Sequence, residues 1–509
     1  MKRCRNHADL NVTVRLPGIG VLFTVALSRS AILPGDGNYR DNLNAGRASG
    51  RDGRVGAGHG RAEELRVLIV TDQYEPMVGG VPTVTRELAR GLAERGHAVQ
   101  VLAPSASGRG SIGTGSGLGS DSAGQLTVAA RRSVRWPWYE GQRLGLLSPS
   151  AAGTVIDGFA PDVVHVHSPL TLGVMARSAA RRRRVPVIYT NHYLPANVHP
   201  TAGRSGPATA LSASAPASLV PRVARATRAT GEAVAGASGA LFDVGFYGYL
   251  TGFANRCDRV TAPTATALLL LRDHGLRAPS QVVSNGVDLD AFSPGPDSVE
   301  YAESLRRRYA LPAGRPLILS VSRLSPEKRA DVLIEAVARL ETGHAVLALA
   351  GSGPDAQRLR ALAARLGVSE RVRFLGFIPA ADLPGLYRLA DVFAIASEAE
   401  LQSLVTMEAM ASGLPVVAVN AGALGELVHP GENGFLTRPG LVGDVAGSLD
   451  LLCRDAALRA RMSKAALRII ADHDQHRLLA LWESIYRALA SRDTTVGREG
   501  QAKVSDGQP

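Results

Sequence analysis

Short apolar runs alternate with amphipathic stretches along most of this 509-residue chain. The run L-R-V-L-I-V begins at Leu65, and after a Gly-rich turn Val84, Leu88 and Leu92 recur at helical spacing until Gly96. The pattern predicts a buried strand, a loop and a helix. A repeat of this unit is the basis of an open sheet with helices on its faces.

The same unit recurs in two series. The first continues through P-D-V-V-H-V-H, V-P-V-I-Y-T-N-H and R-V-T-A-P-T, and the second runs from P-L-I-L-S-V-S-R to P-V-V-A-V-N-A-G. Two alternating series predict an α/β chain with two parallel-sheet domains, each covered by helices on both faces. Ligands of such sheets bind at the carboxyl ends of the strands, where the polar loops of this chain fall.

Composition shifts predict the domain boundaries. Gly, Arg, Asn and Asp dominate residues 35–62, which favours a disordered or misassigned extension. The predicted segments are an extension over 1–64, a first domain over 65–285 with low-complexity mobile inserts at 105–124 and 201–240, a second domain over 286–475, a helix over 476–491 that packs back toward the first domain, and a disordered tail over 492–509.

Charge and cysteine usage narrow the functional classes. The net charge is +12 and the pI about 10.0, which suits nucleic acid, an anionic membrane or anionic substrates. Nucleic acid is disfavoured because neither an aromatic single-strand platform nor a recognition helix is visible. The three cysteines lie far apart, which predicts a reduced compartment without disulfides or a zinc site.

No stretch reaches the roughly 18 apolar residues of a spanning helix. Basic residues precede a short apolar run at the N-terminus, so a signal peptide is one alternative, but the run is weak and lies late. We expect a cytoplasmic protein.

The segment E-L-Q-S-L-V-T-M-E carries two carboxylates, Glu400 and Glu408. On one helix they would lie about 12 Å apart and on faces about 80° apart, so they could hold two ends of an extended ligand. Ser403 can cap a helix whose first N–H groups, from Leu404 to Thr406, would face an anion. This order suits the sugar, diphosphate and ribose of a nucleotide-sugar. Alone, two glutamates eight residues apart around a helix usually belong to a solvated surface.

Two further segments suit a diphosphate. Gly79 and Gly80 let a loop backbone approach phosphates, although an isolated Gly-Gly also fits a plain tight turn. Arg323 and Lys328 follow a buried strand and can neutralise a leaving diphosphate at its carboxyl end. Alone, basic loop residues are mostly solvated.

The histidines and paired aspartates do not indicate a metal site. His165 and His167 share a strand face without acidic or Cys partners, which favours packing or cleft lining. Asp288 and Asp290 fall in the turn-rich joint N-G-V-D-L-D, where Asp suits turns. His192 ends a strand, and on its own it would be structural.

Taken together, the motifs resemble a retaining glycosyltransferase of family 4 with the GT-B architecture, in which two Rossmann-like domains face each other across a cleft. In family order over about residues 65–490, the chain carries V-G-G-V, H-V-H-S-P, T-N-H, S-N-G-V-D, S-V-S-R-L-S-P-E-K, A-G-S-G-P, F-L-G-F-I and E-A-M-A-S-G-L-P-V-V-A.

The resemblance assigns roles residue by residue. It implies that Arg323 and Lys328 bind the donor phosphates, Glu408 binds the ribose and Glu400 contacts the transferred sugar, with His192 nearby. It also implies that the residues after F-L-G line the base pocket, although a strand end entering the core fits them nearly as well. The predicted catalytic residues are His192 and Glu400, and the predicted donor-binding residues are Gly79, Gly80, Arg323, Lys328, Phe377, Ile378, Ser403, Leu404, Val405 and Glu408. Neither metal nor cofactor is expected, since GT-B enzymes generally stabilise the diphosphate with Arg, Lys and helix N-termini.

One departure bears on the substrate. Many family members have Gly-Phe-Gly after the first glutamate, whereas this chain has Leu401-Gln402-Ser403, which leaves the shape of the sugar pocket open. A Gln there also occurs in members that act on lipids, including diacylglycerol glucosyltransferases. We therefore expect a UDP-glucose-type donor and a lipid, lipid-linked or other glycan acceptor. The alternatives are a GDP-mannose-dependent mannosyltransferase acting on phosphatidylinositol or a soluble acceptor, and a nucleotide-sugar-binding protein without transferase activity.

Two basic segments could contact a membrane. Residues 131–146 combine arginines with aromatic residues, and 181–184 are four consecutive arginines. They could seat the first domain on the anionic inner face of the plasma membrane. An acceptor-side loop and a solvated helix end explain them equally well.

Overall fold

The computed structural model describes residues 10–15, 22–27, 64–108, 111–114, 125–135, 142–195, 231–295 and 297–501. The chain divides into two compact units, Met1–Glu64 and Leu65–Pro509. In the smaller unit, β1 (Leu10–Arg15) pairs antiparallel with β2 (Leu22–Leu27). This hairpin lies within the segment expected to be disordered. The expectation rested on the composition of residues 35–62 and overlooked the β-branched alternation in L-N-V-T-V-R.

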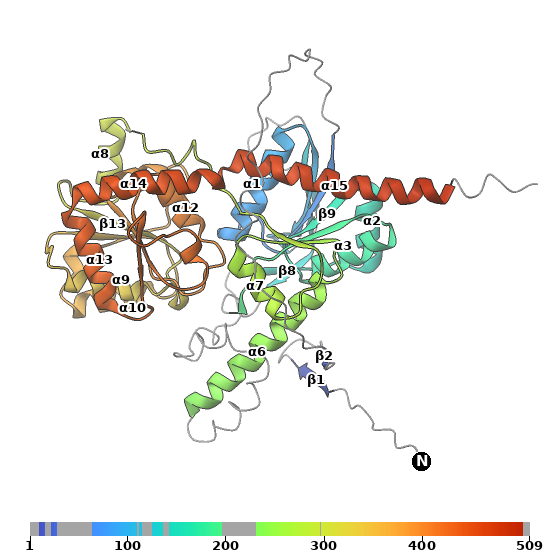
Figure 1. Cartoon of the computed structure of the whole chain (residues 1–509), viewed down its shortest axis with the longest axis horizontal. Coiled ribbons are helices and arrows are strands. Elements are labelled where there is room, and N and C mark those ends of the chain that lie inside the picture. Colours follow the sequence, from blue (N-terminus) through green and yellow to red (C-terminus); the bar gives the residue numbers. More distant parts are fainter. Residues whose placement is uncertain are drawn as a thin grey trace, which may run out of the picture. The chain divides into compact units, whose positions relative to one another are not determined.

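The larger unit contains two sheets (Figure 1). Among its described residues, the first sheet has the order β12-β11-β10-β9-β3-β4-β6-β5 and is parallel except for β5, which runs antiparallel to β6. Its inner strands β9 and β10 are buried throughout, as a parallel sheet covered on both faces requires. The elements are β3 (Arg66–Val70), α1 (Gly80–Glu94), β4 (Ala98–Pro104), β5 (Ser111–Thr114), β6 (Leu126–Arg131), β7 (Ser133–Arg135), β8 (Arg143–Gly145), α2 (Pro149–Phe159), β9 (Val163–Val166), α3 (Thr171–Arg182), β10 (Val187–Thr190), α6 (Gly231–Ala254), β11 (Arg259–Ala262), α7 (Ala265–Asp273) and β12 (Ser280–Val282).

The second sheet is parallel throughout the described residues, with the order β15-β14-β13-β16-β17-β18. Its elements are α8 (Val299–Arg308), β13 (Leu317–Val321), η3 (Pro326–Lys328), α9 (Ala330–Arg339), β14 (Val346–Ala350), α10 (Ala356–Arg365), η4 (Ser369–Arg371), β15 (Val372–Gly376), α11 (Leu383–Leu389), β16 (Val392–Ile395), α12 (Leu404–Ala411), β17 (Val416–Val419), η5 (Leu424–Glu426), β18 (Gly434–Thr437), α13 (Val442–Arg454), α14 (Ala456–Ile470), η6 (Ala471–His473) and α15 (Gln475–Gln501).

Both sheets reverse their strand order at their first strand. In the first sheet β3 lies between β4 and β9, and in the second β13 lies between β14 and β16. The loops that leave neighbouring strands on opposite sides of such a point diverge and open a crevice. The sheet order therefore places a crevice after β3 and β9 in one domain and after β13 and β16 in the other.

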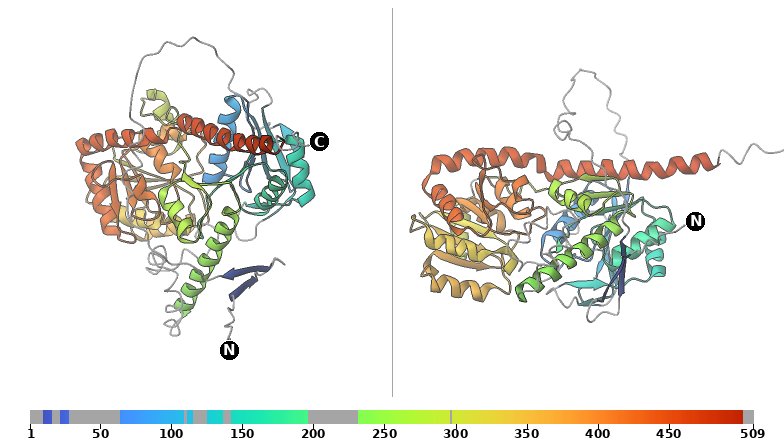
Figure 2. Two further views of the ribbon diagram at one scale, coloured as in Figure 1. Left: turned by 45° about the vertical axis from the view of Figure 1, so that its right-hand side comes forward. Right: turned by 60° about the horizontal axis from the view of Figure 1, so that its bottom comes forward.

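The chain crosses between the two sheets twice, after β12 and again before α15. The crossings are joined where Val287 donates its N–H to the carbonyl of His473 at 2.9 Å and accepts from Gln475 N–H at 3.1 Å. Beyond them α15 packs on the first sheet, because Trp482 and Tyr486 share a hydrophobic core with residues of β3 and α1. Figure 2 shows α14 and α15 running from one sheet to the other in both views.

Parts of the predicted inserts and tail carry regular structure. Ser111–Thr114 forms β5, and α6 begins at Gly231, inside the insert expected over 201–240. At the C-terminal end α15 continues to Gln501, past the helix expected over 476–491. Residues 105–108 begin the first insert and lie in the described ranges, whereas residues 109–110, 115–124, 201–230 and 502–509 lie outside those ranges. None of the helices in the described part is long and apolar enough to cross a bilayer.

Candidate active site

A cleft of about 1310 Å³ lies between the two sheets, at the carboxyl ends of their strands. Loops of both domains line it, as the strand orders require. The structure brings all the predicted site residues together there, since its lining includes Gly79, Gly80, His192, Arg323, Lys328, Phe377, Ile378, Glu400, Ser403, Leu404, Val405 and Glu408. Their individual roles stay predictions.

Helix α12 begins immediately after Ser403, which is its N-cap. The Ser403 backbone is extended, and its Oγ accepts from the N–H of Thr406 at 3.3 Å. Glu400 therefore lies in the loop before the helix, and the geometry of two glutamates on one helix does not apply. Because Ser403 occupies the N–H of Thr406, the predicted anion site keeps the N–H groups of Leu404 and Val405.

Glu408 is held on α12 by a buried tyrosine. The Tyr387 hydroxyl donates to Glu408 Oε2 at 2.8 Å and also lies 3.2 Å from the carbonyl of Val405. Burial raises the pKa of Glu408 to about 7, against the opposing effect of the Tyr387 hydrogen bond. Sequence reasoning missed Tyr387, because a tyrosine at an apolar helical position is indistinguishable from a core residue.

The two predicted phosphate-binding cations each contact a carboxylate. Lys328 Nζ lies 2.7 Å from Glu400 Oε1, with side chains 22% and 13% exposed. Arg323 lies 2.6 Å from Glu327 Oε1, which also accepts from the Ser325 hydroxyl at 2.6 Å. These ion pairs hold the cations at the cleft wall, where an incoming diphosphate would compete with the carboxylates.

The strand-end loop that carries Arg323 is backed by the motif A-G-S-G-P. A Cβ on Gly351, whose φ is +136°, would lie 1.9 Å from the carbonyl oxygen of Ser322. A Cβ on Gly353 would lie 2.2 Å from that of Leu324. Only glycine allows these backbones to approach so closely, so the loops after β13 and β14 fix each other's position.

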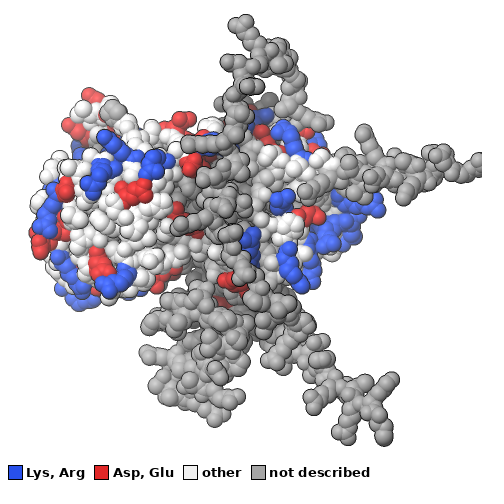
Figure 3. All heavy atoms as spheres, in the orientation of Figure 1, with Lys and Arg blue, Asp and Glu red and all other residues white. Residues whose placement is uncertain are grey.

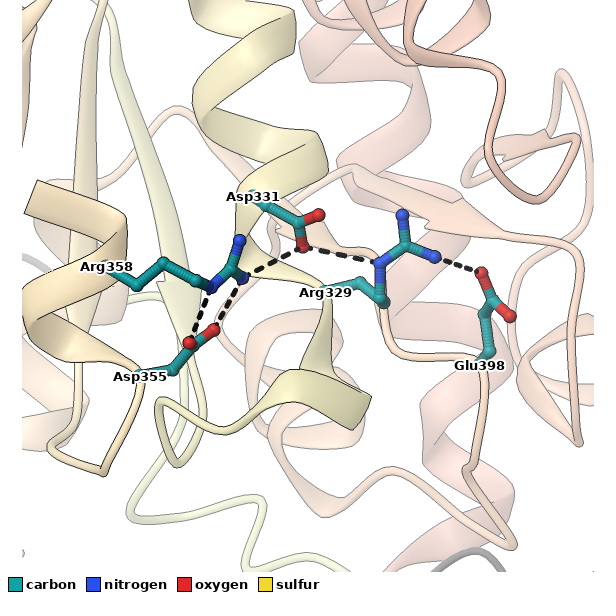
Figure 4. Close-up of polar contacts among 5 residues, drawn as sticks. All are labelled: Arg329, Asp331, Asp355, Arg358 and Glu398. Atoms are coloured by element: carbon teal, nitrogen blue, oxygen red, sulfur yellow. Dashed lines mark hydrogen bonds and ion pairs between the residues drawn. The ribbon is translucent and has the colours of Figure 1, made fainter. Parts of the chain in front are cut away.

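A chain of ion pairs fixes the residue after Lys328 (Figure 4). Arg329 adopts a left-handed backbone with φ +51°, and its guanidinium contacts Glu398 at 2.9 Å and Asp331 at 3.3 Å. Arg358 extends the chain, pairing with Asp355 at 2.6 Å and lying 4.0 Å from Asp331. Since Glu398 precedes Glu400 by two residues, this network ties the Lys328 loop to the Glu400 loop.

The opposite wall begins with the Gly79–Gly80 loop and the N-terminus of α1. A Cβ on Gly80 would lie 3.9 Å from Leu404 Cδ1, so this loop faces the start of α12 across the cleft. A Cβ on Gly79 would meet Pro82 Cδ at 3.7 Å. Both are ordinary contacts, so packing within the protein does not itself require glycine at either position.

Two titratable residues of this wall, His192 and Asp72, have pKa values shifted by burial. Burial lowers the pKa of His192 to about 4, so its imidazole is uncharged at neutral pH. Asp72, two residues after β3, accepts from the N–H of Gly145 at 3.2 Å, and burial raises its pKa to about 7. Sequence reasoning missed Asp72, although a polar residue at the end of a buried strand is the same signal that identified Arg323.

The phenylalanine and isoleucine predicted at the base pocket differ in environment. Phe377 is 62% exposed at the cleft, whereas Ile378 packs against the core of the second domain. An exposed aromatic face at a cleft rim is suited to stacking against a planar ring.

The departure at Leu401–Ser403 serves the contact between domains. Leu401 packs into the core of the first domain, and its carbonyl accepts from the Thr264 hydroxyl at 2.8 Å. Gln402 accepts from the N–H of Asn285 at 2.8 Å and donates to the Ser284 hydroxyl at 3.0 Å. Of the residues that replace the common Gly-Phe-Gly, Leu401 therefore joins the loop to the first domain and Gln402 joins it to the first crossing.

A carboxylate of the second domain caps a helix of the first. Glu426 accepts from the N–H groups of Ala265 and Thr266 at 2.9 and 2.7 Å, at the N-terminus of α7. A carboxylate at this position both satisfies free N–H groups and meets the positive end of the helix dipole. Leu401 and Glu426 of the second domain thus both contact the N-terminus of α7.

Asp288 and His165, which the sequence also singled out, have structural partners. Asp288 Oδ1 accepts from the N–H groups of Asp290 and Ala291 at 3.0 and 2.9 Å, as a turn aspartate does. His165 is fully buried and contacts the hydroxyls of Tyr486 and Thr190. Within the described residues, no group of three His, Cys, Asp or Glu side chains is placed to hold a metal ion.

Comparison with known families matches both domains. Residues 78–291 match the model of Glycosyltransferase Family 4, and residues 302–468 match that of Glycosyl transferases group 1. The chain is 36% identical over 249 residues to a D-inositol 3-phosphate glycosyltransferase of Nocardia farcinica, covering 44% of this chain and 53% of that protein. It thus spans about half the length of this relative.

A longer match is to the alpha-monoglucosyldiacylglycerol synthase of Streptococcus pneumoniae, 26% identical over 367 residues, covering 72% of this chain and 73% of the synthase. Among solved structures, Anabaena Alr3699/HepE in complex with UDP-glucose matches with a TM-score of 0.60 and 23% identity. It covers 84% of this chain and all of that one. At this identity the likeness concerns the fold alone, and it confirms the predicted GT-B architecture.

Proposed function

We propose that this chain, which belongs to the GT-B glycosyltransferases with a family 4 domain and a group 1 domain, transfers a hexose from a nucleoside diphosphate sugar to a lipid or lipid-linked acceptor with retention of configuration. UDP-glucose is the favoured type of donor. The observation that carries the proposal is the cleft in which Lys328, Glu400 and Glu408 face the Gly79–Gly80 loop.

The second domain supplies what a donor requires. Glu408 would accept from the ribose hydroxyls, and the N–H groups of Leu404 and Val405 would meet the diphosphate. Lys328 and Arg323 would share their charge between their carboxylate partners and the departing diphosphate, which needs most stabilisation as its bond to the sugar breaks. These groups meet the diphosphate charge without a metal ion, and we propose a metal-independent reaction.

The first domain supplies the acceptor side. The acceptor hydroxyl would attack the sugar on the face that the diphosphate leaves, and a phosphate oxygen would take its proton. Glu400 and His192 would hold the sugar from opposite walls of the cleft. Enclosure between the two domains would exclude water and so protect the donor from hydrolysis.

Two observations support a lipid acceptor. The Streptococcus relative, of which the chain covers 73%, is named as a synthase of a glucosyldiacylglycerol, and apolar residues Leu170, Phe246 and Leu250 line the first-domain side of the cleft. The Nocardia relative, named for D-inositol 3-phosphate, favours the second candidate, a mannosyltransferase acting on an inositol-containing or soluble acceptor.

We further propose that the first domain docks on the anionic inner face of the plasma membrane. Arg181, Arg182 and Arg184 are exposed at the end of α3, and Figure 3 shows Lys and Arg gathered over this region. Each such residue is worth about 1 kcal/mol near an anionic surface. In the other predicted segment, 131–146, Arg135 and Arg143 line the cleft instead, which supports an acceptor-side loop.

A donor and acceptor screen tests the proposal. The purified chain is given UDP-glucose or GDP-mannose with vesicles of diacylglycerol, vesicles of phosphatidylinositol, or soluble inositol 3-phosphate, and the released nucleotide is measured. We expect UDP release that depends on diacylglycerol and is lost in Glu400→Gln but kept in the exposed control Glu94→Gln. Release of GDP with an inositol acceptor would establish the second candidate. Tight nucleotide binding without turnover, unchanged by Glu400→Gln, would instead indicate a binding protein.

Vesicle sedimentation tests the membrane surface. We expect binding to anionic but not to neutral vesicles, and loss of binding in Arg181→Glu/Arg182→Glu. Arg307→Glu, on the second domain and 72% exposed, should leave binding unchanged. Failure to bind either vesicle would contradict the membrane proposal and leave the transfer proposal standing.

A further inference from the structure

A second histidine, His167, lies behind His192 in the cleft wall. The two follow neighbouring strands of the first sheet. His167 follows β9 directly and His192 lies two residues after β10, which pairs with β9 in parallel register. His167 is 1% exposed. Of the two, only His192 lines the cleft, so His167 stands one layer behind it.

The two rings meet edge to edge. His167 Nδ1 lies 2.9 Å from His192 Nε2, the ring centroids are 5.2 Å apart and the ring planes differ by only 11°. In this arrangement the lone pair of one nitrogen points along the N–H of the other, which is the geometry of a well-aligned hydrogen bond. Both imidazoles are neutral, because burial lowers both pKa values, so one ring donates and the other accepts.

The far nitrogen of His167 indicates which ring donates. His167 Nε2 is buried and has no hydrogen-bond partner among the described residues. A buried N–H without a partner is rarer in proteins than an unsatisfied acceptor, so this nitrogen is better left unprotonated. The proton of neutral His167 then resides on Nδ1, the nitrogen that faces His192.

A small cavity adjoins His167. It has a volume of about 20 Å³, and His167, Thr190, Ser284 and Asn285 contribute to its walls. A space of this size accommodates one water molecule, and the polar side chains among its otherwise apolar walls are the kind that hold one. A water that donates to His167 Nε2 would satisfy the buried acceptor and reinforce the same tautomer.

We propose that His167 is a positioning residue that donates its Nδ1–H to His192 and thereby holds His192 in the tautomer with its proton on Nδ1. The polar atom that His192 then offers to a ligand is an N–H donor. Such a group can hydrogen-bond an oxygen of the sugar but cannot accept the acceptor's proton there. This assignment of His192 as a donor and not a base rests on the proposed transferase function; the tautomer itself does not.

Nitrogen-15 spectroscopy of the full chain tests the tautomer directly. The protein is labelled with [15N]histidine, and the His192 signals among its 12 histidines are assigned by their loss in His192→Gln. Long-range 15N–1H correlations at neutral pH should show the His192 proton on Nδ1. A His192 proton on Nε2 would overturn the proposal, whether or not any transfer activity is ever found.

A matched pair of variants tests the positioning role. In His167→Asn the side-chain amide can place an N–H near the former Nδ1, whereas His167→Leu of similar size offers no donor. The leucine variant should show both His192 tautomers and a kcat about 3- to 10-fold lower with the donor KM unchanged, since a neutral hydrogen bond is lost. The asparagine variant should restore the single tautomer and most of kcat. Melting temperatures show whether both variants are folded. If both are folded and have the same tautomers and the same kcat, the positioning role of His167 is contradicted. If the leucine variant does not fold, the asparagine spectrum decides alone, and mixed tautomers there would contradict it.

Discussion

The two walls of the cleft differ in how they treat charge. The wall of the second domain carries Lys328 and Glu400 in an ion pair, and beside it Arg323 pairs with Glu327. The wall of the first domain is neutral around His192, whose pKa burial lowers to about 4, and its arginines Arg135 and Arg143 line the cleft outside this neutral part. Both walls stand at the switch point of a similar sheet, so the fold does not account for the difference. It comes from the residues that follow the strands.

This difference matches what each wall would bind. A diphosphate carries charge that must be stabilised as it leaves, and partly exposed cations held by carboxylates can be redirected to it at little cost. A sugar or lipid hydroxyl carries no charge, and burying charged groups against it would cost free energy. The comparison therefore predicts that changes on the second-domain wall act on nucleotide binding and that changes on the first-domain wall act on transfer.

The largest effect is expected for Lys328→Ala. The variant lacks the cation that would stabilise the leaving diphosphate, and Glu400 loses its ion-pair partner. The value of kcat/KM should therefore fall by about 10²- to 10³-fold. Steady-state release of nucleotide measures this. Lys464→Ala changes an exposed lysine on α14 and should be silent. A Lys328→Ala enzyme with normal kcat/KM would contradict the claim that the cations of the second-domain wall stabilise the leaving diphosphate.

Glu408→Gln should weaken nucleotide binding by about 10- to 100-fold at pH 8, the value of a hydrogen bond to a charged group. The pKa of Glu408 is about 7 in the free protein, and ribose hydroxyls prefer the ionised acceptor. The affinity of the wild type for the nucleotide should therefore increase as pH rises from 6 to 8, because a larger fraction of Glu408 is already ionised before binding.

Calorimetric titration with the nucleoside, which has no phosphate to titrate, measures this dependence. The pH dependence should vanish in Glu408→Gln and persist in Glu94→Gln. A nucleoside affinity that falls with rising pH in the wild type would show that Glu408 binds in its protonated form.

Gln402→Ala should destabilise the contact between the domains by about 1–2 kcal/mol, because Gln402 makes two hydrogen bonds to the first crossing. Chemical denaturation measures this change. Gln100→Ala removes a single 3.3 Å side-chain contact within the first domain and serves as the control. If Gln402 instead shapes the sugar pocket alone, donor KM would rise while stability stayed unchanged.

The smallest effect is expected at Arg329, where two substitutions distinguish the cost of the left-handed backbone from the loss of the ion pairs. Both Arg329→Gly and Arg329→Ala remove the ion pairs to Asp331 and Glu398, but only glycine adopts the left-handed backbone without cost. The glycine variant should be more stable than the alanine variant by about 1 kcal/mol. Denaturation curves for the pair test this, and equal stabilities would mean that the Lys328 loop rearranges when the ion pairs are lost.

The sequence predicted the alternating sheets and the residues at their strand ends because both follow from local patterns. Arg323, Lys328 and His192 each come after a buried apolar run, and parallel strands carry such residues to one edge. The hairpin in residues 10–27 was missed because the composition of the neighbouring segment outweighed a short alternation.

Other features of the site depend on contacts between distant segments. Tyr387 reaches Glu408 from a different helix, Gln402 reaches the crossing 118 residues earlier, and His167 reaches His192 only because β9 and β10 are neighbours. No local pattern carries these contacts. They follow from strand order and loop path, which the chain's spacing alone does not specify.

The most direct test of the comparison is the affinity for UDP or GDP, whichever the screen identifies, measured by calorimetry for the wild type and for Lys328→Ala, Glu408→Gln and His192→Ala. Lys328→Ala and Glu408→Gln should weaken binding by about tenfold or more. His192→Ala should leave the affinity within about twofold while lowering turnover, because a neutral donor on the opposite wall serves the transfer step. If His192→Ala weakened nucleotide binding as much as Lys328→Ala, the division of work between the two walls would be contradicted.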